Sequence, residues 1–409
     1  MTTTLVQTAR RAKQYWFVLV VAVIAVVSLV RIISDTDDIS SAGTIRAAIV
    51  ATCPILMAAL GGLWAERAGV VNIGLEGQMI LGTWGAAFFT YHGGPWAGVI
   101  GAALFGIIGG LLHAVATVTF GVDHIVSGVA INLIGAGAAT FLAEAIFPDL
   151  KGGGPRQLVG LDSPMKITVP GISDASLDLA AKGWFFISDV AAFVAALTTS
   201  LSTLSVVVFA LVAISGWVLW RTSFGLRLRS CGENPQAAET LGINVYLYKY
   251  IAVVVSGGLA GIGGGFLALV ASSGFNTGQT GGRGYIGLAA MIFGNWRPGG
   301  LLAGALTFGY TDSLRLRNAD AVHALLLLLA IGLLAFAAFR AVQGSWRSGV
   351  GIGVVGALLL VWYLGTETVP RDFTSMTPYV TTMLVLALGA QRLRMPAADG
   401  LPYRRGSAG

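Results

Sequence analysis

The chain has 409 residues, of which 55% are hydrophobic and only 11% charged. Soluble domains carry about 25% charged residues, so these proportions exclude an ordinary soluble protein. The formal net charge of +6 does not indicate nucleic-acid binding either. The basic residues are scattered between apolar segments and form no stripe with interleaved aromatic side chains.

Apolar segments recur along the whole chain. They lie at about 16–33, 44–64, 77–91, 96–119, 125–147, 203–220, 250–271, 284–294, 299–311, 321–339, 349–365 and 379–391. Residues 190–200 are either an interfacial helix or the start of the following span. Because a span needs roughly 20 residues, the sequence predicts an all-α polytopic membrane protein of about 10–12 transmembrane helices, including short broken ones.

The N-terminal segment follows Arg10, Arg11 and Lys13 and is closed by Arg31. No small-residue cleavage pattern directly follows it, so we expect an uncleaved first span rather than a signal peptide. With a cytoplasmic N-terminus, the inner loops hold 15 of the 25 Lys and Arg residues and the outer loops hold 10. This bias agrees with the positive-inside rule and predicts that both termini are cytoplasmic.

Small-xxx-small spacings occur at Gly106/Gly110, Gly257/Gly261/Gly265 and Gly300/Gly304. Such spacings suit close helix packing in lipid, although 57 glycines make chance matches common. The sequence contains no HExxH, no GxSxG and no Gly-Lys dipeptide, so it holds no P-loop. We therefore expect a protein that is not an enzyme, with no metal site and no ATPase site of its own.

The stretch AERAGVVNIGLEGQMILG (65–82) places polar groups and glycines between two apolar segments. Polar residues at membrane depth usually face a cavity or a partner, but they also cap or satisfy broken backbone. Candidate pathway residues are therefore Asn72, Glu76, Gln78, Asn132 and Asn276. Asn132 and Asn276 are equally well explained as backbone partners. Glu144 is expected to be solvated, and Arg283 to lie at the outer interface.

The polar stretch GENPQAAETLGI (232–243) predicts a helix of about two turns. Asn234 can cap it, Pro235 suits its first position, and Gly242 can end it in a left-handed conformation. Ala237, Ala238 and Leu241 are expected to share one face, which would suit docking into a groove of another protein. An ordinary surface turn is the alternative interpretation of this stretch alone.

This stretch resembles the coupling helix of permease subunits from ABC importers of the branched-chain amino acid, ribose and nucleoside type. The resemblance extends to AALGGLWAERAGVVNIGLEGQMILG (58–82), DHIVSGVAINLI (123–134) and GRGYIGLAAMIFGNWRPGGLLAGALTFG (282–309), in that family's order and approximate spacing. The ERAGVVNIGLEG form looks most like permeases for nucleosides or simple sugars.

The resemblance implies a bacterial plasma-membrane subunit that forms a translocation path in the lipid bilayer. Implied partners are a second permease, expected to be a different chain, a cytoplasmic ABC ATPase and an extracellular binding protein or lipoprotein. The resemblance implies no cofactor in this chain and ATP used by the partners. The same resemblance implies a role in coupling to the ATPase for Glu233, Asn234, Ala237, Ala238 and Gly242.

The resemblance also suggests a division of the chain into three parts. Residues 1–44 form a cytoplasmic tail and first span, 45–340 the permease core, and 341–409 extra spans with a basic cytoplasmic tail that the family pattern does not explain. The core includes an outer loop at 148–189 and a cytoplasmic coupling loop at 221–249. Alternatives are a permease for branched-chain amino acids or another small polar solute, or an ion-coupled secondary transporter that uses Glu76.

Overall fold

The computed structural model of the chain describes residues 21–315, 319–342, 346–370 and 393–406, together with Met376 and Val380. The first predicted span is therefore described only from Val21, as an apolar helix that runs Val21–Ser34. Apart from Val380, the predicted segment at 379–391 lies outside the described residues.

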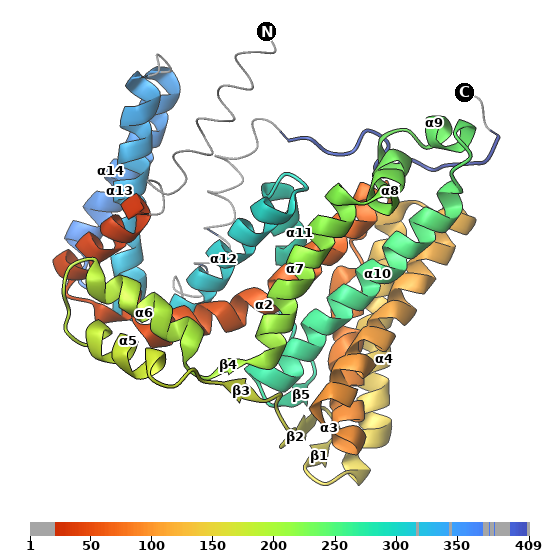
Figure 1. The fold of residues 1–409 in the computed structure, drawn as a ribbon, viewed down its shortest axis with the longest axis horizontal. Coiled ribbons are helices and arrows are strands. Elements are labelled where there is room, and N and C mark those ends of the chain that lie inside the picture. The colour runs from red at the N-terminus through yellow and green to blue at the C-terminus, as the bar shows by residue number, and fades with distance from the viewer. Residues whose placement is uncertain are drawn as a thin grey trace. The chain divides into compact units, whose positions relative to one another are not determined.

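Most described residues are helical (Figure 1). In chain order the main helices are α2 (Ala42–Arg67), α3 (Leu75–Ala114), α4 (His124–Ile146), α5 (Ile172–Ala180), α6 (Ile187–Thr198), α7 (Thr203–Arg221), α8 (Ser223–Glu233), α9 (Pro235–Thr240), α10 (Val245–Phe266), α11 (Arg283–Phe293), α12 (Pro298–Arg315), α13 (Ala319–Val342) and α14 (Trp346–Gly365). Short 3-10 turns lie at Asp37–Ile39 and Phe147–Asp149, and π-helical turns at Val115–Thr119 and Leu267–Ala271 extend α3 and α10.

Within the described residues, six helices are long and apolar enough to cross a membrane, as judged by length and composition. They comprise α2, α3, α4, α7, α10 and α13, with their flanking turns, and four shorter apolar helices accompany them. Large apolar side chains remain exposed on these helices, such as Leu133 and Phe141 on α4. The predicted all-α polytopic membrane fold is confirmed.

Helix α3 covers two predicted segments, 77–91 and 96–119. The break between them is real, because Gly94 has a φ of 81° and ψ of 177° and is followed by Pro95. Proline removes a backbone donor and clashes with the preceding turn, which explains the kink at this point. The sequence therefore predicted the break correctly.

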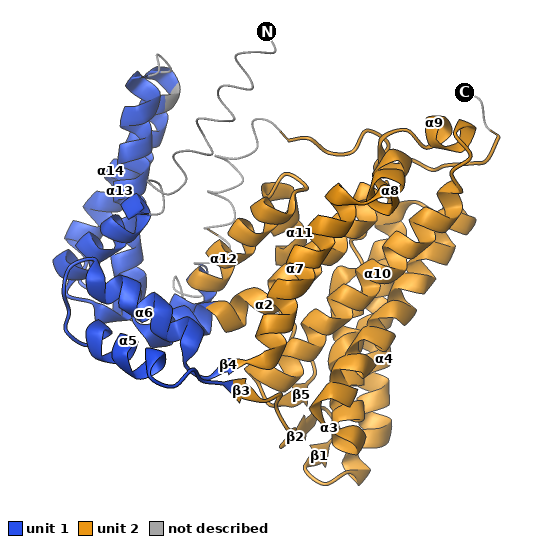
Figure 2. Cartoon of the chain, in the orientation of Figure 1, with its two compact units in different colours: residues 1–48, 167–201, 311–378 blue, residues 49–166, 202–310, 379–409 orange. Residues whose placement is uncertain are grey.

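The chain divides into two compact units, coloured separately in Figure 2. Unit 1 comprises residues 1–48, 167–201 and 311–378. Within it, α13 packs on α14 and α5 packs on α6. Arg31 donates from its guanidinium to the carbonyls of Gly183 and Trp184 and pairs with Asp189 at 3.1 Å, so the first helix is tied to the α5–α6 hairpin.

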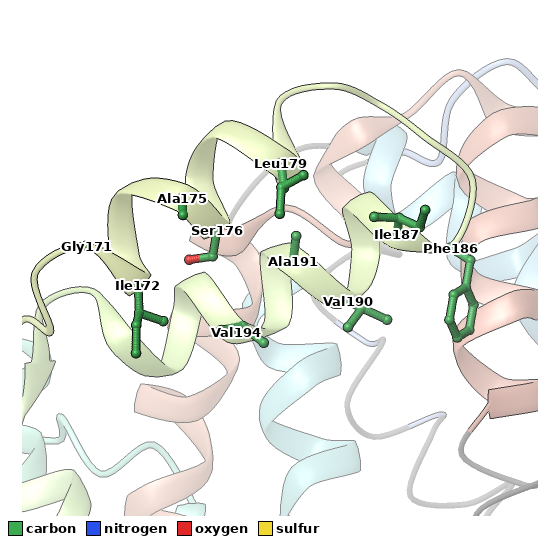
Figure 3. Close-up of a pocket in the computed structure, with 10 residues that line it drawn as sticks. All are labelled: Gly171, Ile172, Ala175, Ser176, Leu179, Phe186, Ile187, Val190, Ala191 and Val194. Carbon is green, nitrogen blue, oxygen red and sulfur yellow. The ribbon is translucent and has the colours of Figure 1, made fainter.

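Helices α5 and α6 line an open groove of about 500 Å³ (Figure 3). Its lining is almost wholly apolar and includes Ile172, Phe186 and Val194. None of the residues predicted to take part in transport lines it. The predicted outer loop at 148–189 thus contains α5 and the start of α6, and its Gly- and Pro-rich composition did not suggest α5. The segment at 190–200 forms most of α6, a helix separate from α7, and is not the start of the following span.

Unit 2 comprises residues 49–166, 202–310 and 379–409. Its centre is the pairing of α3 with α10, which approach each other through glycines. A Cβ on Gly106 would lie 2.2 Å from the carbonyl oxygen of Gly257, and one on Gly82 would lie 2.3 Å from that of Gly261. The small-residue spacings at Gly106/Gly110 and Gly257/Gly261 are therefore helix contacts, as predicted.

Short strands lie within the predicted outer loop and in the segments around α7 and α10. Strands β1 (Gly153–Gly154), β2 (Gln157–Val159) and β5 (Gly274–Asn276) form an antiparallel sheet in the order β1-β2-β5, with Leu158 opposite Phe275. Strands β3 (Lys166–Ile167) and β4 (Leu201–Ser202) form a second pair. Leu158 and Phe275 are buried in a cluster with Trp84 and Phe147.

Candidate functional site

The loop between α2 and α3 carries the polar residues of the ERAGVVNIGLEG stretch. Helix α2 ends at Arg67 and α3 begins at Leu75, and Gly69 between them has a φ of 81°. Only glycine adopts that conformation without steric cost, which explains why the chain turns here. The stretch is thus a break between two long helices.

Asn72 and Gln78 form a mutually bonded amide pair beneath this loop. Asn72 Nδ2 donates to Gln78 Oε1 at 3.0 Å and to Ser256 Oγ of α10 at 2.8 Å. Gln78 Nε2 donates back to Asn72 Oδ1 at 3.3 Å. Asn72, Gln78 and Ser256 are all fully buried, so the three side chains form a neutral hydrogen-bonding cluster. Ser256 was not singled out from the sequence, since one serine in an apolar run gives no distinct signal.

Asn132 of α4 joins three elements. Its Oδ1 accepts from the backbone N–H of Gly77 at 2.8 Å, in the first turn of α3 where N–H groups lack helical partners. Its Nδ2 donates to the carbonyl of Ile73 at 3.1 Å and to the hydroxyl of Tyr285 at 3.0 Å. These contacts match the expectation that Asn132 satisfies broken backbone.

Glu76 accepts hydrogen bonds from the start of α11. Its carboxylate receives the backbone N–H of Gly282 at 2.9 Å and that of Gly284 at 2.6 Å. A carboxylate at a helix N-terminus is stabilised both by these donors and by the helix dipole. Glu76 is buried, and it caps a short helix that belongs to another part of the sequence.

Asn276 lies apart from these four residues. It is exposed at the end of β5, where it pairs with Gln157, and its backbone N–H donates to Gln279 Oε1 at 3.1 Å. The structure therefore brings Asn72, Glu76, Gln78 and Asn132 together at the α2–α3 break and places Asn276 apart from them, at the end of β5.

A small cavity of about 70 Å³ lies against α3 at Ile80 and Thr83, and none of the five candidate pathway residues lines it. Its polar lining consists of Thr83, Thr140, Thr277, Gln279 and Thr280. Gln279 Nε2 is buried without a hydrogen-bond partner. The volume is enough for about two waters at roughly 30 Å³ each, and is too small for a nucleoside or a sugar. Among the described residues, no group of three His, Cys, Asp or Glu side chains could hold a metal ion.

The predicted coupling helix is present as α9. Asn234 Oδ1 accepts from Ala237 N at 2.9 Å, Pro235 takes the first position, and Gly242 has a φ of 79°. The predicted cap, first residue and left-handed end of this helix are confirmed. Glu233, at the end of α8, pairs with Arg67 at 3.6 Å.

The prediction that Ala237, Ala238 and Leu241 share one face is wrong. Ala237 and Leu241 are exposed, the latter to 80%, whereas Ala238 is 1% exposed. Ala238 packs inward against Cys231 and Val245. Consecutive positions on an α-helix lie about 100° apart around its axis, so Ala237 can face solvent while Ala238 faces inward. Leu241 lies just beyond α9, which ends at Thr240, so it leaves the helical spacing that the prediction assumed.

Three other polar residues, Glu144, Arg283 and Asn295, also have partners within the chain. Glu144 forms an exposed ion pair with Arg156 at 3.5 Å, as its expected solvation implies. Arg283 donates to the carbonyls of Gln279 and Thr280 in its own turn. Asn295 lies in a turn with a φ of 53°, and its side chain accepts from Arg394 N at 2.6 Å.

Comparison with known proteins places the chain in a family. The family described as branched-chain amino acid transport system, permease component, matches residues 44–338. The guanosine ABC transporter permease protein NupQ of Bacillus subtilis is 34% identical over 370 residues, covering 88% of this chain and 96% of that protein. The nucleoside ABC transporter permease protein NupC of Lactococcus lactis is also 34% identical, covering 87% and 94%.

A putative glucose ABC transporter permease protein of Haloferax volcanii is 32% identical and covers 68% of this chain and 78% of its own length. No solved structure gives a significant match. The family match takes in the α2–α3 break, α9 and the cap of α11. This multi-pass membrane protein therefore belongs to the branched-chain amino acid-type permease family and is a permease component of an ABC transport system.

Proposed function

We propose that this chain forms the translocation path for nucleosides in an ATP-driven importer. The observation that carries the proposal is its similarity, over nearly the whole chain, to permeases named for guanosine and nucleosides. The neutral hydrogen-bonding side chains at the α2–α3 break, those of Asn72, Gln78 and Asn132, support it, because nucleosides present neutral hydrogen-bonding groups. A second permease, cytoplasmic ATPase subunits and an extracellular binding protein or lipoprotein complete the transporter in this proposal.

In this proposal the residues at the α2–α3 break shape the wall of the path. Asn72, Gln78 and Asn132 hold the broken backbone beside it, and Glu76 fixes the start of α11. Asn276 lies at the outer mouth. An external binding protein supplies the affinity for the solute, so this chain needs only weak polar contacts along the path.

Coupling to ATP hydrolysis takes place at α9 in the same proposal. Asn234 and Gly242 define the ends of that helix. Ala237 on the helix and Leu241 just beyond it are exposed, and Ala238 packs inward. Glu233 joins its base to Arg67. ATP is hydrolysed by the partner subunits, and this chain carries no ATPase site or cofactor.

The test is uptake of labelled guanosine in a strain that lacks this chain, with and without a plasmid copy. We expect uptake to be restored, to depend on ATP and on the partner subunits, and to be competed by other nucleosides but not by leucine or glucose. Competition by glucose or leucine alone would favour the sugar or amino acid alternative. Uptake by this chain alone in liposomes, driven by an ion gradient, would contradict the class of transporter proposed.

A further inference from the structure

Residues 396–405, called here the C-terminal strap, lie against the coupling region. The strap belongs to unit 2 and runs past α8 to α9, as the dark blue trace in Figure 1 shows. Its Ala398 N donates to the carbonyl of Gly232 at 2.9 Å, and Ala397 N donates to Glu233 Oε2 at 3.3 Å. The family match ends at residue 338, so these contacts come from outside the matched region.

Three backbone segments meet at this point with no room for side chains. A Cβ on Gly232 would lie 2.4 Å from the carbonyl oxygen of Arg67. A Cβ on Gly69 would lie 3.1 Å from Gly232 Cα and 3.2 Å from the carbonyl oxygen of Ala398. The end of α8 and the strap are therefore in direct contact with the α2–α3 loop.

A buried polar group anchors the strap. Asp399 is only 8% exposed, and its carboxyl group lies against that of Glu66. Glu66 in turn accepts from Trp296 Nε1 at 2.6 Å, and Lys249 Nζ donates to the carbonyl of Gly69 at 3.3 Å. Among the described residues neither carboxyl oxygen of Asp399 has a hydrogen-bond donor, and a charged carboxylate is costly in such a place. Burial here therefore favours the protonated form of Asp399.

The far end of the strap packs on α9 itself. Tyr403 packs against the buried cluster of Cys231, Ala238 and Val245. Arg405 Nε pairs with Glu239 of α9 at 3.4 Å. A helix of six residues has no stability of its own, so its position depends on the residues that pack against it. The other residues of this cluster lie between 231 and 248, whereas Tyr403 comes from the strap.

We propose that the C-terminal strap holds α9 to the α2–α3 loop, so that a displacement of α9 reaches the segment that carries Asn72 and Glu76. Tyr403 and Arg405 are positioning residues in this device. The inference rests on the proposed function, because it takes α9 as the helix that the ATPase subunits move. The close contacts at Gly69 and Gly232 make the loop, the end of α8 and the strap move together.

The test compares the double variant Tyr403→Ala/Arg405→Ala with Met395→Ala/Leu401→Ala. The control side chains lie just before the strap and within it, and they are 56% and 57% exposed. In the full transporter in proteoliposomes, we expect the first variant to retain its ATPase subunits and its rate of ATP hydrolysis. Solute transported per ATP should fall about fivefold or more, the size of a weak coupling free energy. The control should match the wild type.

An unchanged transport ratio in the first variant would overturn the proposal. Loss of the ATPase subunits would overturn it too, because the strap would then serve assembly rather than transmission. A wild-type transporter that fails to move nucleosides would refute the substrate assignment alone. In that case amide hydrogen exchange tests the strap, because this measurement needs no solute. The α9 amides should exchange faster in Tyr403→Ala/Arg405→Ala than in the wild type.

A second test fixes the strap in place. The pair Glu239→Cys/Arg405→Cys loses the ion pair, and a short bis-maleimide can join the two new thiols while Cys53 and Cys231 stay buried. We expect the transport ratio to fall in the unlinked variant and to recover on crosslinking. A crosslink that stops transport would show that the strap leaves α9 in each cycle, which contradicts a permanent hold.

Discussion

The polar side chains at the α2–α3 break explain how a broken helix persists inside an apolar bundle. Asn132 satisfies a backbone N–H of α3, and Glu76 satisfies two backbone N–H groups of α11. An unsatisfied backbone group in an apolar environment costs several kcal/mol, so these contacts have a structural role whatever the solute. The rule that a polar residue at membrane depth faces a cavity or a partner singled out Glu76 and Asn132, and the structure shows backbone partners for both. The rule could not name these partners, because those of Glu76 lie some 200 residues away along the chain.

Substitution of Glu76 should separate a structural role from an ion-coupling role. Glu76→Ala leaves the N–H groups of Gly282 and Gly284 without their acceptor and should cost about 1–3 kcal/mol for each. Glu76→Gln keeps one acceptor oxygen and should lose less. Thermal unfolding in detergent and uptake in cells measure the two effects. If Glu76→Gln abolished uptake while its melting temperature stayed at the wild-type value, the carboxylate would instead have a direct role in transport.

The strap should respond to pH through Asp399. Burial raises the pKa of Asp399 from 3.8 to about 7, and the neighbouring carboxyl group of Glu66, the ammonium of Lys249 and the guanidinium of Arg67 offset this only in part. Because the docked strap binds the proton more tightly than the free strap, docking is strongest below about pH 4 and weakens up to about pH 7.

Amide hydrogen exchange of residues 397–403, corrected for the intrinsic effect of pH, should therefore increase between pH 5 and pH 7 and level off above. Asp399→Asn removes the titrating group and should abolish this dependence. Persistence of the same pH profile in Asp399→Asn would show that another group controls the strap.

At the scale of elements, the positions of the helices could be predicted from the apolar segments of the sequence. The contacts between distant segments could not. The limits of α4, α7 and α11 fall within a residue or so of the apolar segments, because the apolar runs are bounded by polar or turn residues. Strands β1, β2 and β5 were missed, since two- or three-residue strands leave no alternating pattern to detect. The burial of Ala238 was missed for a similar reason. It depends on Tyr403, which lies 165 residues further along the chain.

The α3–α10 contact should be sensitive to a single methyl group. In Gly106→Ala the new Cβ would lie 2.2 Å from the carbonyl oxygen of Gly257, and both atoms belong to rigid helices. We expect a loss of about 1–3 kcal/mol or failure to accumulate in the membrane. Gly137→Ala is the matched control, because a Cβ there meets nothing within 4 Å. Melting temperatures in detergent compare the two, and equal values would mean that the helices separate more easily than this packing implies.

At the scale of the whole molecule, the sequence identified the class and the family but not the division into units. Unit 1 combines three stretches that are far apart in the chain, and its α5–α6 hairpin lies within and just beyond what the sequence shows as a polar loop. Contacts such as Arg31 with Gly183 define that unit, and no local pattern encodes them. The sequence also does not identify the solute, because the buried amides suit any small neutral polar molecule. The charge pattern, by contrast, is a property of the whole chain and predicts its orientation.

That orientation can be tested with single cysteines, since the native Cys53 and Cys231 are both buried and provide a low background. Lys151 lies exposed in the predicted outer loop, and Leu241 is 80% exposed beside the coupling helix. With cytoplasmic termini, Lys151→Cys should react with a membrane-impermeant maleimide in intact cells, and Leu241→Cys only after the cells are opened. The reverse result would invert the topology. It would also place α9 and the strap on the side where no ATPase could reach them, so this one measurement bears on both proposals.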